Sequence, residues 1–396
     1  MEVRPGYKLT DVGIVPRDWV VVPLSETARR ISRGASPRPI DNPLWFDDES
    51  TVGWVRISDV TKSHRYLNKT EQRLSDAGIR RSRFVPRGSL LMSICATVGR
   101  PVETQIDVCI HDGFVVFEQP LCDQSFLYYV LSSLEKDWAR SGQTGSQMNL
   151  NTALIRARRV AIPVSRVEQR AIASTLSDVD ALLAGLDQLV IKKRNLKQAV
   201  MQQLLTGKIR LEGFNEEWQA RRLGEVVKFK KGQPITEGSA IPGPVPVIAG
   251  GKEPAYFHNK SNRSGKTITI SASGSAGYVA FFNEPIFASD CTTIGESEDY
   301  SIEFVYYLLK WKQSTIYAVQ TGGAQPHVHA SDISPIEVIW PSLPEQVAIA
   351  SILTDMDAEI SALEARRDKT KALKQGMMQE LLTGRTRLVR LETVRG

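Results

Sequence analysis

Residues 168–211 and 345–388 of this 396-residue chain are two copies of one sequence element, related by a constant offset of 177 residues without a gap. Of the 44 aligned positions, 23 hold the same residue. Both copies begin with Glu-Gln-x-Ala-Ile-Ala and end with Leu-Leu-Thr-Gly. Identity at this level indicates an internal duplication, so we expect a fold that contains two equivalent halves.

Each copy has the start and stop signals of one long helix. A Ser-x-x-Glu capping box precedes the first apolar residues of both copies. Gly207 and Gly384 follow the last pair of leucines, where a glycine commonly ends a helix. About 40 residues at 1.5 Å each predict a helix roughly 60 Å long.

Apolar residues recur in both copies with the 4-3-4-3 spacing of a coiled-coil seam. The spacing loses register in the middle of each copy, at Lys193 and Thr370. A heptad run alone also fits an ordinary core helix, but two capped helices of equal length favour an antiparallel intramolecular coiled coil. The predicted seam consists of Ile172, Leu176, Val179, Leu183 and Leu186 in the first copy and Ile349, Leu353, Met356, Ile360 and Leu363 in the second.

The two repeats separate two other segments that resemble each other weakly. Both segments open near a Trp-x4-Leu-x-Glu motif, at Trp19 and Trp218, and both contain short strand-like runs and one short helix before the repeat. We therefore predict an α+β protein in which two globular domains alternate with two long helices about a pseudo-two-fold axis. The predicted boundaries are 1–164 for the first domain, 165–211 for the first helix, 212–341 for the second domain, 342–390 for the second helix and 391–396 for a tail.

Composition places the chain among globular proteins, with 42% hydrophobic and 24% charged residues. No apolar run approaches the ~20 residues that span a bilayer. The first residues lack the apolar segment of a signal peptide, so a cytoplasmic protein without a membrane partner is expected. The four cysteines show no metal-ligand spacing and are expected to be buried reduced thiols.

Basic residues cluster in both globular segments. Residues 56–87 hold nine Lys or Arg against three acids, and residues 228–266 hold seven against two. Either cluster alone fits a solvated charged face. One cluster in each duplicated segment, together with a net charge of +6, favours the electrostatic footprint of a DNA-binding protein.

Motifs for catalysis are incomplete. Gly265-Lys266-Thr267 resembles the end of a P-loop, but Lys260 stands where the first glycine is required. His327 and His329 could share one strand face, but no third ligand follows at useful spacing. We therefore expect a binding protein that has no catalytic residues, no bound metal and no cofactor of its own.

These features together resemble the DNA-specificity subunits of type I restriction–modification systems, over essentially the whole chain. The two helix repeats are the most specific part of the resemblance. Tyr7-Lys8 and the run from Pro16 to Trp19 also look like that family. A Thr-Gly-x-Gln motif precedes the first helix at 144–147, and the second copy, Thr-Gly-x-x-Gln at 321–325, is one residue longer.

The resemblance implies a division of labour among chains. Each globular domain would be a target recognition domain that reads one half of a split site on double-stranded DNA. The helices would fix the gap between the halves and dock methyltransferase subunits, two of them, and restriction subunits are a further partner that the resemblance admits. Adenine methylation and ATP-dependent cleavage, with S-adenosylmethionine, ATP and Mg, would belong to those partner chains.

The expected DNA contacts are basic side chains within the two clusters, because Lys and Arg bind phosphates and reach into the grooves. They are Arg65, Lys69, Arg80, Arg81 and Arg83 in the first domain and Lys230, Lys252, Lys260 and Arg263 in the second. Two other classes of protein stay open from the residues alone. One is a coiled-coil scaffold that joins two protein-binding domains, and the other is a nucleic-acid enzyme acting by itself.

Overall fold

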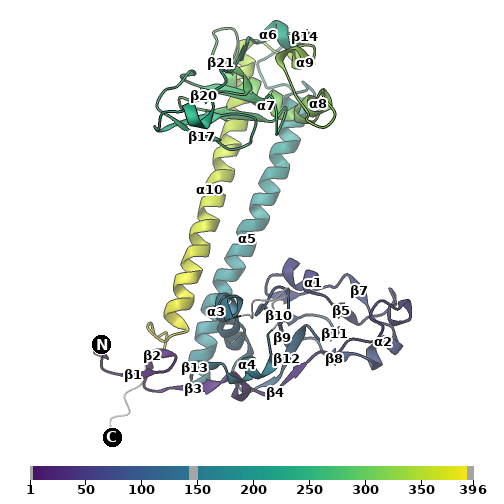
Figure 1. Ribbon diagram of the computed structural model, residues 1–396, viewed down its shortest axis with the longest axis vertical. Coiled ribbons are helices and arrows are strands. Elements are labelled where there is room, and N and C mark those ends of the chain that lie inside the picture. Colours follow the sequence, from purple (N-terminus) through teal and green to yellow (C-terminus); the bar gives the residue numbers. More distant parts are fainter. Residues whose placement is uncertain (1–2, 142–149, 390–396) are drawn as a thin grey trace. The chain divides into compact units, whose positions relative to one another are not determined.

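The computed structural model of the protein describes residues 3–141 and 150–389, and the chain divides into two compact units. Unit 1 comprises Met1–Gly185 with Asp368–Gly396, and unit 2 comprises Leu186–Arg367. Each unit therefore holds one globular domain, the first part of one long helix and the last part of the other (Figure 1). The predicted tail, 391–396, and the motif at 144–147 lie outside the described residues.

The two long helices are α5 (Arg166–Leu204) and α10 (Leu343–Leu381), and each has 39 residues. At 1.5 Å per residue each is about 58 Å long. Both end sooner than the predicted segments 165–211 and 342–390, and a turn follows each helix. The reason is the glycine in that turn: Gly207 and Gly384 both have a φ of 67°, the left-handed conformation that ends a helix.

The early part of one long helix packs beside the late part of the other in each unit. In unit 1, Lys374 Nζ of α10 lies 2.5 Å from Asp180 Oδ1 of α5. In unit 2, Lys197 Nζ of α5 lies 2.5 Å from Asp357 Oδ1 of α10. Pairing of early with late residues means that the helix segments run antiparallel, which confirms the predicted direction of the pair.

All ten predicted seam residues are buried or half-buried. The outer seam positions have a second role that the heptad pattern does not reveal. Ile172 and Leu176, at the start of α5, belong to the core of the first domain, and Ile349 and Leu353 belong to the core of the second. The ends of the helices are shared the same way: Leu381 and Leu382 complete the core of unit 1, and Leu204 and Leu205 complete that of unit 2.

The globular domain of unit 1 is built on a five-stranded sheet in the order β4-β12-β9-β10-β6 and a four-stranded sheet in the order β7-β5-β11-β8. Two two-stranded sheets, β1-β2 and β13-β3, complete it. Its strands are β1 (Tyr7–Thr10), β2 (Gly13–Pro16), β3 (Trp19–Pro23), β4 (Ala28–Arg33), β5 (Gly53–Val55), β6 (Tyr66–Leu67), β7 (Gln72–Arg73), β8 (Arg83–Val85), β9 (Leu90–Ser93), β10 (Pro101–Thr104), β11 (Val108–Ile110), β12 (Phe114–Pro120) and β13 (Arg159–Pro163). Its helices are α1 (Ile57–Lys62), α2 (Asp76–Arg80), α3 (Gln124–Ser141) and α4 (Thr152–Ala157), with 3-10 turns at Leu24–Glu26 and Pro43–Trp45.

The globular domain of unit 2 repeats this plan with fewer strands. A four-stranded sheet runs β15-β21-β18-β19, a three-stranded sheet runs β17-β16-β20, and β14 pairs with β22. The strands are β14 (Gln219–Arg222), β15 (Phe229–Lys231), β16 (Val245–Ile248), β17 (Tyr256–His258), β18 (Thr267–Ser271), β19 (Val279–Phe282), β20 (Phe287–Ala288), β21 (Cys291–Gly295) and β22 (Glu337–Trp340). The helices are α6 (Leu223–Val226), α7 (Ile302–Trp311), α8 (Gln313–Ala318) and α9 (Ala330–Ile333), with a 3-10 turn at Glu237–Ser239.

The sheets that lead into the long helices are equivalent in the two units. β3 pairs antiparallel with β13, which feeds α5, and β14 pairs antiparallel with β22, which feeds α10. The main sheets share one strand order, with β4, β12, β9 and β10 matching β15, β21, β18 and β19. The predicted α+β architecture, in which two related domains alternate with two long helices, is confirmed.

Three of the four free cysteines are buried, and Cys95 is half-buried. Burial raises the pKa of Cys109 and of Cys122 to about 11 and that of Cys291 to about 12. These thiols therefore stay protonated near neutral pH. Within residues 3–141 and 150–389, none of the helices combines the length and the hydropathy that a membrane-spanning helix needs.

Candidate nucleic-acid interface and domain junctions

Polar residues of the repeat meet where each globular domain joins its helix pair. In unit 2, Glu345 at the start of α10 is fully buried and receives two hydrogen bonds from Arg210, at 2.7 and 2.8 Å. Trp218 Nε1 donates a third, at 2.8 Å. Arg210 lies just beyond the end of α5, so this carboxylate ties the end of one long helix to the start of the other.

The same carboxylate clamp forms in unit 1. Glu168 at the start of α5 is 1% exposed and accepts hydrogen bonds from Nε and Nη2 of Arg387, the latter at 2.9 Å. Arg387 also holds both carboxylate oxygens of Asp18, at 2.9 and 2.7 Å, and thereby lowers the pKa of Asp18. The hydroxyl of Tyr7 donates to the Gly384 carbonyl at 2.8 Å, so both ends of the described chain meet here.

Sequence reasoning missed Arg210 and Arg387, although both carry a signal. They are identical in the two copies and follow the terminating glycine by three residues. The clamps differ in one partner, because Trp19 Nε1 in unit 1 is buried and has no hydrogen-bond partner within the described chain. The additional partner in unit 1 is Asp18, which accepts hydrogen bonds from Arg387.

A second clamp in unit 1 joins the domain helix α3 to both long helices. The hydroxyl of Tyr129 on α3 donates to Asp180 of α5 at 2.8 Å, and Lys374 of α10 reaches the other oxygen of that carboxylate. The Lys374 ammonium also lies 5.6 Å from the centre of the Tyr129 ring. Burial, with the nearby Asp180 charge, raises the pKa of Tyr129, so its hydroxyl stays a donor.

Unit 2 forms the equivalent clamp from α7. The hydroxyl of Tyr307 donates to Asp357 of α10 at 2.8 Å, and Lys197 of α5 binds the other oxygen at 2.5 Å. The Lys197 ammonium lies 4.9 Å from the centre of the Tyr307 ring. The aspartate of the repeat therefore connects three elements in each unit.

A third junction explains the glutamine of the repeat. The side chain of Gln169 accepts from the amide of Asp123, just before α3, and donates to the carbonyl of Pro163 at the end of β13, both at 2.7 Å. In unit 2 the equivalent bonds run from Ser301 N to Gln346 at 3.1 Å and from Gln346 to the Pro341 carbonyl at 3.0 Å. Both glutamines fix the start of the domain helix to the strand that feeds the long helix.

The structure corrects the assignment of Arg65 as a DNA contact. Arg65 is 6% exposed, and its guanidinium binds Glu103 at 2.7 Å, Ser177 at 2.8 Å and Ser125 at 2.5 Å. A further bond, at 3.2 Å, reaches the hydroxyl of Tyr129. Arg65 therefore ties the first domain to α3 and α5, and the buried partners that hold it could not be inferred from a run of charges.

The other basic candidates of the first domain lie at its surface. Lys69, Arg80 and Arg81 are exposed, and their side chains form no hydrogen bond or ion pair within the described residues. Arg83 is half-buried, and its Nε donates to the Arg33 carbonyl at 2.7 Å. Three of the five candidates are therefore free to meet a phosphate, and Arg83 is partly engaged.

In the second domain Lys230, Lys252 and Lys260 are exposed. Arg263 is half-buried, and its guanidinium is occupied by Thr293 Oγ1 and by the carbonyls of Asn262 and Lys231, each at 2.8 Å. We therefore remove Arg263 from the expected DNA contacts, as we do Arg65. Protein groups occupy the guanidinium groups of both arginines.

A loop with the same backbone conformation occurs in both domains, and the sequence analysis did not predict it. Ala96, between β9 and β10, has a φ of 55°, and Gly274, between β18 and β19, has a φ of 60°. Each loop ends at a glycine, Gly99 or Gly277, with a φ of 82° or 81°. An alanine held in the left-handed region is strained and commonly marks a functional loop.

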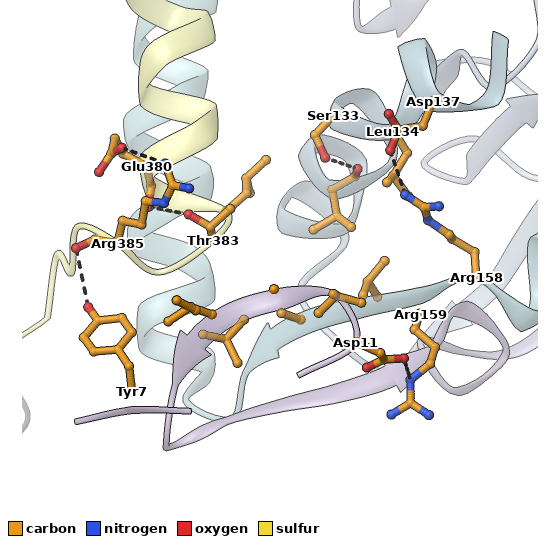
Figure 2. A pocket seen from close by; sticks show the side chains of 18 of the residues that line it. Tyr7, Asp11, Ser133, Leu134, Asp137, Arg158, Arg159, Glu380, Thr383 and Arg385 are labelled. Atoms are coloured by element: carbon orange, nitrogen blue, oxygen red, sulfur yellow. Dashed lines mark hydrogen bonds and ion pairs between the residues drawn. The ribbon is translucent and has the colours of Figure 1, made fainter. Parts of the chain in front are cut away.

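A groove of about 1110 Å³ lies in unit 1 between the β1–β2 hairpin, α3 and the end of α10 (Figure 2). Its charged walls are paired: Asp11 lies 2.9 Å from Arg159, and Asp137 lies 2.7 Å from Arg158.

His327 and His329 stack with ring centres 6.1 Å apart in unit 2. Among the described residues, no group of three or more His, Cys, Asp or Glu could hold a metal ion.

Comparison with known protein families identifies both halves of the chain. A family model described as the type I restriction modification DNA specificity domain matches residues 16–192 and 215–373. The EcoprrI specificity subunit of Escherichia coli is 21% identical over 360 residues, covering 86% of this chain and 87% of that protein. The putative MjaX specificity subunit of Methanocaldococcus jannaschii is 22% identical and covers 97% of both.

Solved structures show the same fold. The S subunit of a type I restriction–modification system from M. genitalium superposes with a TM-score of 0.65 at 17% identity, covering 95% of this chain and 98% of that one. A chain from a structure of type I complex assembly and conformational transition gives a TM-score of 0.58 at 16% identity, covering 94% and 99%.

We predict that replacing Arg387 or Arg210 with Met destabilises the unit that the residue closes by about 3–5 kcal/mol. The reason is that either change leaves a buried carboxylate without its counter-charge. Chemical denaturation of the full-length protein measures this effect. Arg385→Met is the matched control, because that side chain is 62% exposed and its change should alter stability by less than about 0.5 kcal/mol.

The effect of Arg387→Met should depend on pH. Because Arg387 lowers the pKa of Asp18 in the folded state, that bond stabilises fully above the ordinary carboxyl pKa and is lost as pH falls through the lowered value. The difference in stability between wild type and Arg387→Met should therefore shrink below about pH 4. An equal difference at pH 3 and pH 7 would contradict this assignment.

Proposed function

This chain belongs to the DNA-specificity subunits of type I restriction–modification systems, and on that premise we propose that it reads a split site on double-stranded DNA, one half with each globular domain. The observation that carries the proposal is the contrast within the duplication. The junction residues Glu168, Gln169 and Asp180 have identical equivalents in the second unit, whereas the basic surfaces of the two domains differ. Two domains that are attached to the helices in the same way but have different surfaces are suited to read two different DNA sequences.

Electrostatic attraction to phosphates would supply most of the affinity. The exposed cations Lys69, Arg80 and Arg81 support this role in the first domain, and Lys230, Lys252 and Lys260 support it in the second. Sequence would be read by side chains that reach base edges in the grooves. The left-handed loops at Ala96 and Gly274 are further candidates, because they recur at equivalent strand connections of both domains.

We propose that α5 and α10 set the gap between the two halves of the DNA site. A helix of 39 residues is about 58 Å long, which corresponds to roughly 17 base pairs at 3.4 Å each. This length limits the spacer to fewer than about two helical turns. A constant helix length thus becomes a constant spacer length, as dimer geometry sets half-site spacing in other DNA-binding proteins.

We further propose that two methyltransferase subunits dock on the long helices. Supporting this, several exposed residues of each helix are identical in both copies. Leu196 and its equivalent Leu373 are 48% and 59% exposed, so each offers an apolar contact to a partner. The other retained exposed positions of the helices are Ser174, Asp178, Ala181, Lys192, Gln198 and Gln202, with Ser351, Asp355, Ala358, Lys369, Gln375 and Gln379 as equivalents.

Catalysis would lie on partner chains under this proposal. Adenine methylation with S-adenosylmethionine would belong to the methyltransferase subunits, and ATP- and Mg-dependent cleavage would belong to a restriction subunit where one is present. This chain would supply DNA recognition and geometry in the cytoplasm. Its own residues would hold no cofactor.

Genome-wide mapping of adenine methylation tests this function. The chain would be co-expressed with a cognate methyltransferase in a host without other adenine methylation. We expect a two-part motif with a constant gap, which disappears when this chain is omitted. A stable complex without any methylation would instead support the alternative, a coiled-coil scaffold, and metal-dependent cleavage by the chain alone would indicate an enzyme.

Lengthening both helices should lengthen the spacer without changing the half-sites. A seven-residue insertion between Gln188 and Leu189, with an equal insertion between Ala365 and Arg366, preserves the heptad seam. It adds about 10.5 Å, or roughly three base pairs. Methylation mapping of the insertion variant would reveal the new spacer, and methylation at the original spacer with full efficiency would refute the ruler.

Arg80→Ala and Arg81→Ala should each weaken DNA binding and reduce its dependence on salt. Each lost phosphate contact lowers the slope of log K against log salt by about 0.9. Fluorescence anisotropy with the target duplex at several salt concentrations gives the slopes. Lys371→Ala is the control, since Lys371 is an exposed cation on α10. Slopes equal to those of wild type would exclude these two arginines as phosphate contacts.

Leu196→Arg and Leu373→Arg should each remove one methyltransferase subunit from the complex, because a charge replaces an apolar contact. Size-exclusion chromatography with light scattering would show a complex with one methyltransferase for either single variant and none for the double variant. Lys371→Arg serves as a control at another exposed position of α10. Two bound methyltransferase subunits in the double variant would place the docking site elsewhere.

A further inference from the structure

We propose that Asp180 and Asp357 determine how strictly the protein discriminates between spacer lengths, by holding each recognition domain at one angle to its helix pair. This inference rests on the proposed function. Helix length alone sets the distance along the helices. The gap that the DNA experiences also depends on how each domain is oriented where it joins them.

Each of these carboxylates receives two directional bonds from two different elements. Asp180 of α5 accepts the hydroxyl of Tyr129 from α3 at 2.8 Å and the ammonium of Lys374 from α10 at 2.5 Å. Rotation of α3 about the helix pair would lengthen the first bond, and sliding of α10 past α5 would lengthen the second. The clamp therefore opposes both motions at a single carboxylate.

The equivalent clamp in unit 2 has the same geometry. Asp357 accepts the Tyr307 hydroxyl at 2.8 Å and binds Lys197 at 2.5 Å. A weaker bond of 3.3 Å links the Tyr307 hydroxyl to Thr354. The agreement extends to the ring contacts, because each lysine also lies over the tyrosine that shares its carboxylate.

The clamps lie in surroundings that make their bonds effective. The side chains of Lys374 and Asp180 are 20% and 25% exposed, and the Tyr129 ring is fully buried. Charge-assisted hydrogen bonds shielded from water are stronger than exposed ones. The remaining contacts of α3 with α5 combine apolar burial, through residues such as Leu176, with the polar bonds of Gln169 and Arg65 described above. Apolar burial keeps the domain attached but is non-directional, so it does not fix the angle.

The duplicated positions around the clamp separate retained from changed residues. Tyr129, Asp180 and Lys374 recur as Tyr307, Asp357 and Lys197, respectively. One helical turn further along, Ser132 and Ser133 of α3 stand where α7 has Lys310 and Trp311. All three clamp residues are retained, as are neighbours such as Tyr128 (Tyr306) and Leu196 (Leu373), so both units keep one clamp geometry.

An error in this angle translates directly into spacer length. A rotation that shifts the recognition surface by about 3.4 Å along the DNA moves it by one base pair. A domain that can rock about its junction would then accept spacers one base pair shorter or longer. The sequence that the domain reads would stay the same, because its recognition loops are unchanged.

The test uses the complete complex with its methyltransferase partner. Methylation rates would be measured on duplexes that carry the native half-sites with the native spacer and with spacers one base pair shorter and longer. For Tyr129→Phe and Tyr307→Phe we expect the preference for the native spacer to fall by about tenfold, the effect of losing one hydrogen bond to a charged group. The double variant should lose more than either single variant.

Controls separate positioning from stability. Tyr306→Phe removes a hydroxyl next to Tyr307 that makes no hydrogen bond to Asp357 in the described structure, and it should keep the native preference. Lys374→Arg keeps the charge and should preserve discrimination, whereas Lys374→Met should relax it. A purely structural defect would lower the unfolding midpoint and reduce the rates at all spacers by the same factor.

The outcomes distinguish this inference from the function beneath it. A wild-type complex that methylates all three spacers equally, or none, would overturn the proposed function together with this inference. A wild-type complex that prefers one spacer, combined with Tyr129→Phe and Tyr307→Phe profiles that match it, would overturn this inference alone. Relaxed spacing with unchanged half-sites would support it.

Discussion

The fold depends on two buried carboxylates, Glu168 and Glu345, each held by an arginine from just beyond the end of the other long helix. Neither carboxylate could stay buried without its counter-charge, since an unpaired buried charge costs several kcal/mol. Each pair therefore forces the end of one helix to meet the start of the other. In unit 1 the pair also brings the C-terminal segment to Asp18, so a unit built from distant parts of the chain closes on itself.

The duplication divides the residues of this protein by task. Residues that mount a domain on the helices, such as Gln169 and Asp180, are the same in both units and make the same bonds. Residues at the domain surfaces differ, and the exposed cations sit on elements with different local structure. A specificity subunit needs this division, because the two halves of a DNA site can differ in sequence while the geometry between them stays constant.

Charge in the sequence did not reveal which arginines of the basic clusters are held by protein groups. Arg65 and Arg263 belong to the basic clusters, yet their guanidinium groups bind protein groups on several sides. Local composition cannot distinguish a cation that stabilises a loop from one that meets a phosphate, because the distinction depends on partners far away in sequence. Arg65 illustrates this point, with partners at Glu103, Ser125 and Ser177.

Periodicity and duplication in the sequence alone determined that two long helices alternate with two related domains, because helix caps and heptad spacing are local properties of the chain. They also marked the residues that matter, including Glu168 and Asp180, as identical pairs. Only the tertiary structure decided what those residues do. Asp180 has two partners that are distant in sequence. Tyr129 lies 51 residues before it, and Lys374 lies 194 residues after it. Contacts over such distances arise from how helices pack and which carboxylates become buried, and no pattern within one segment encodes them.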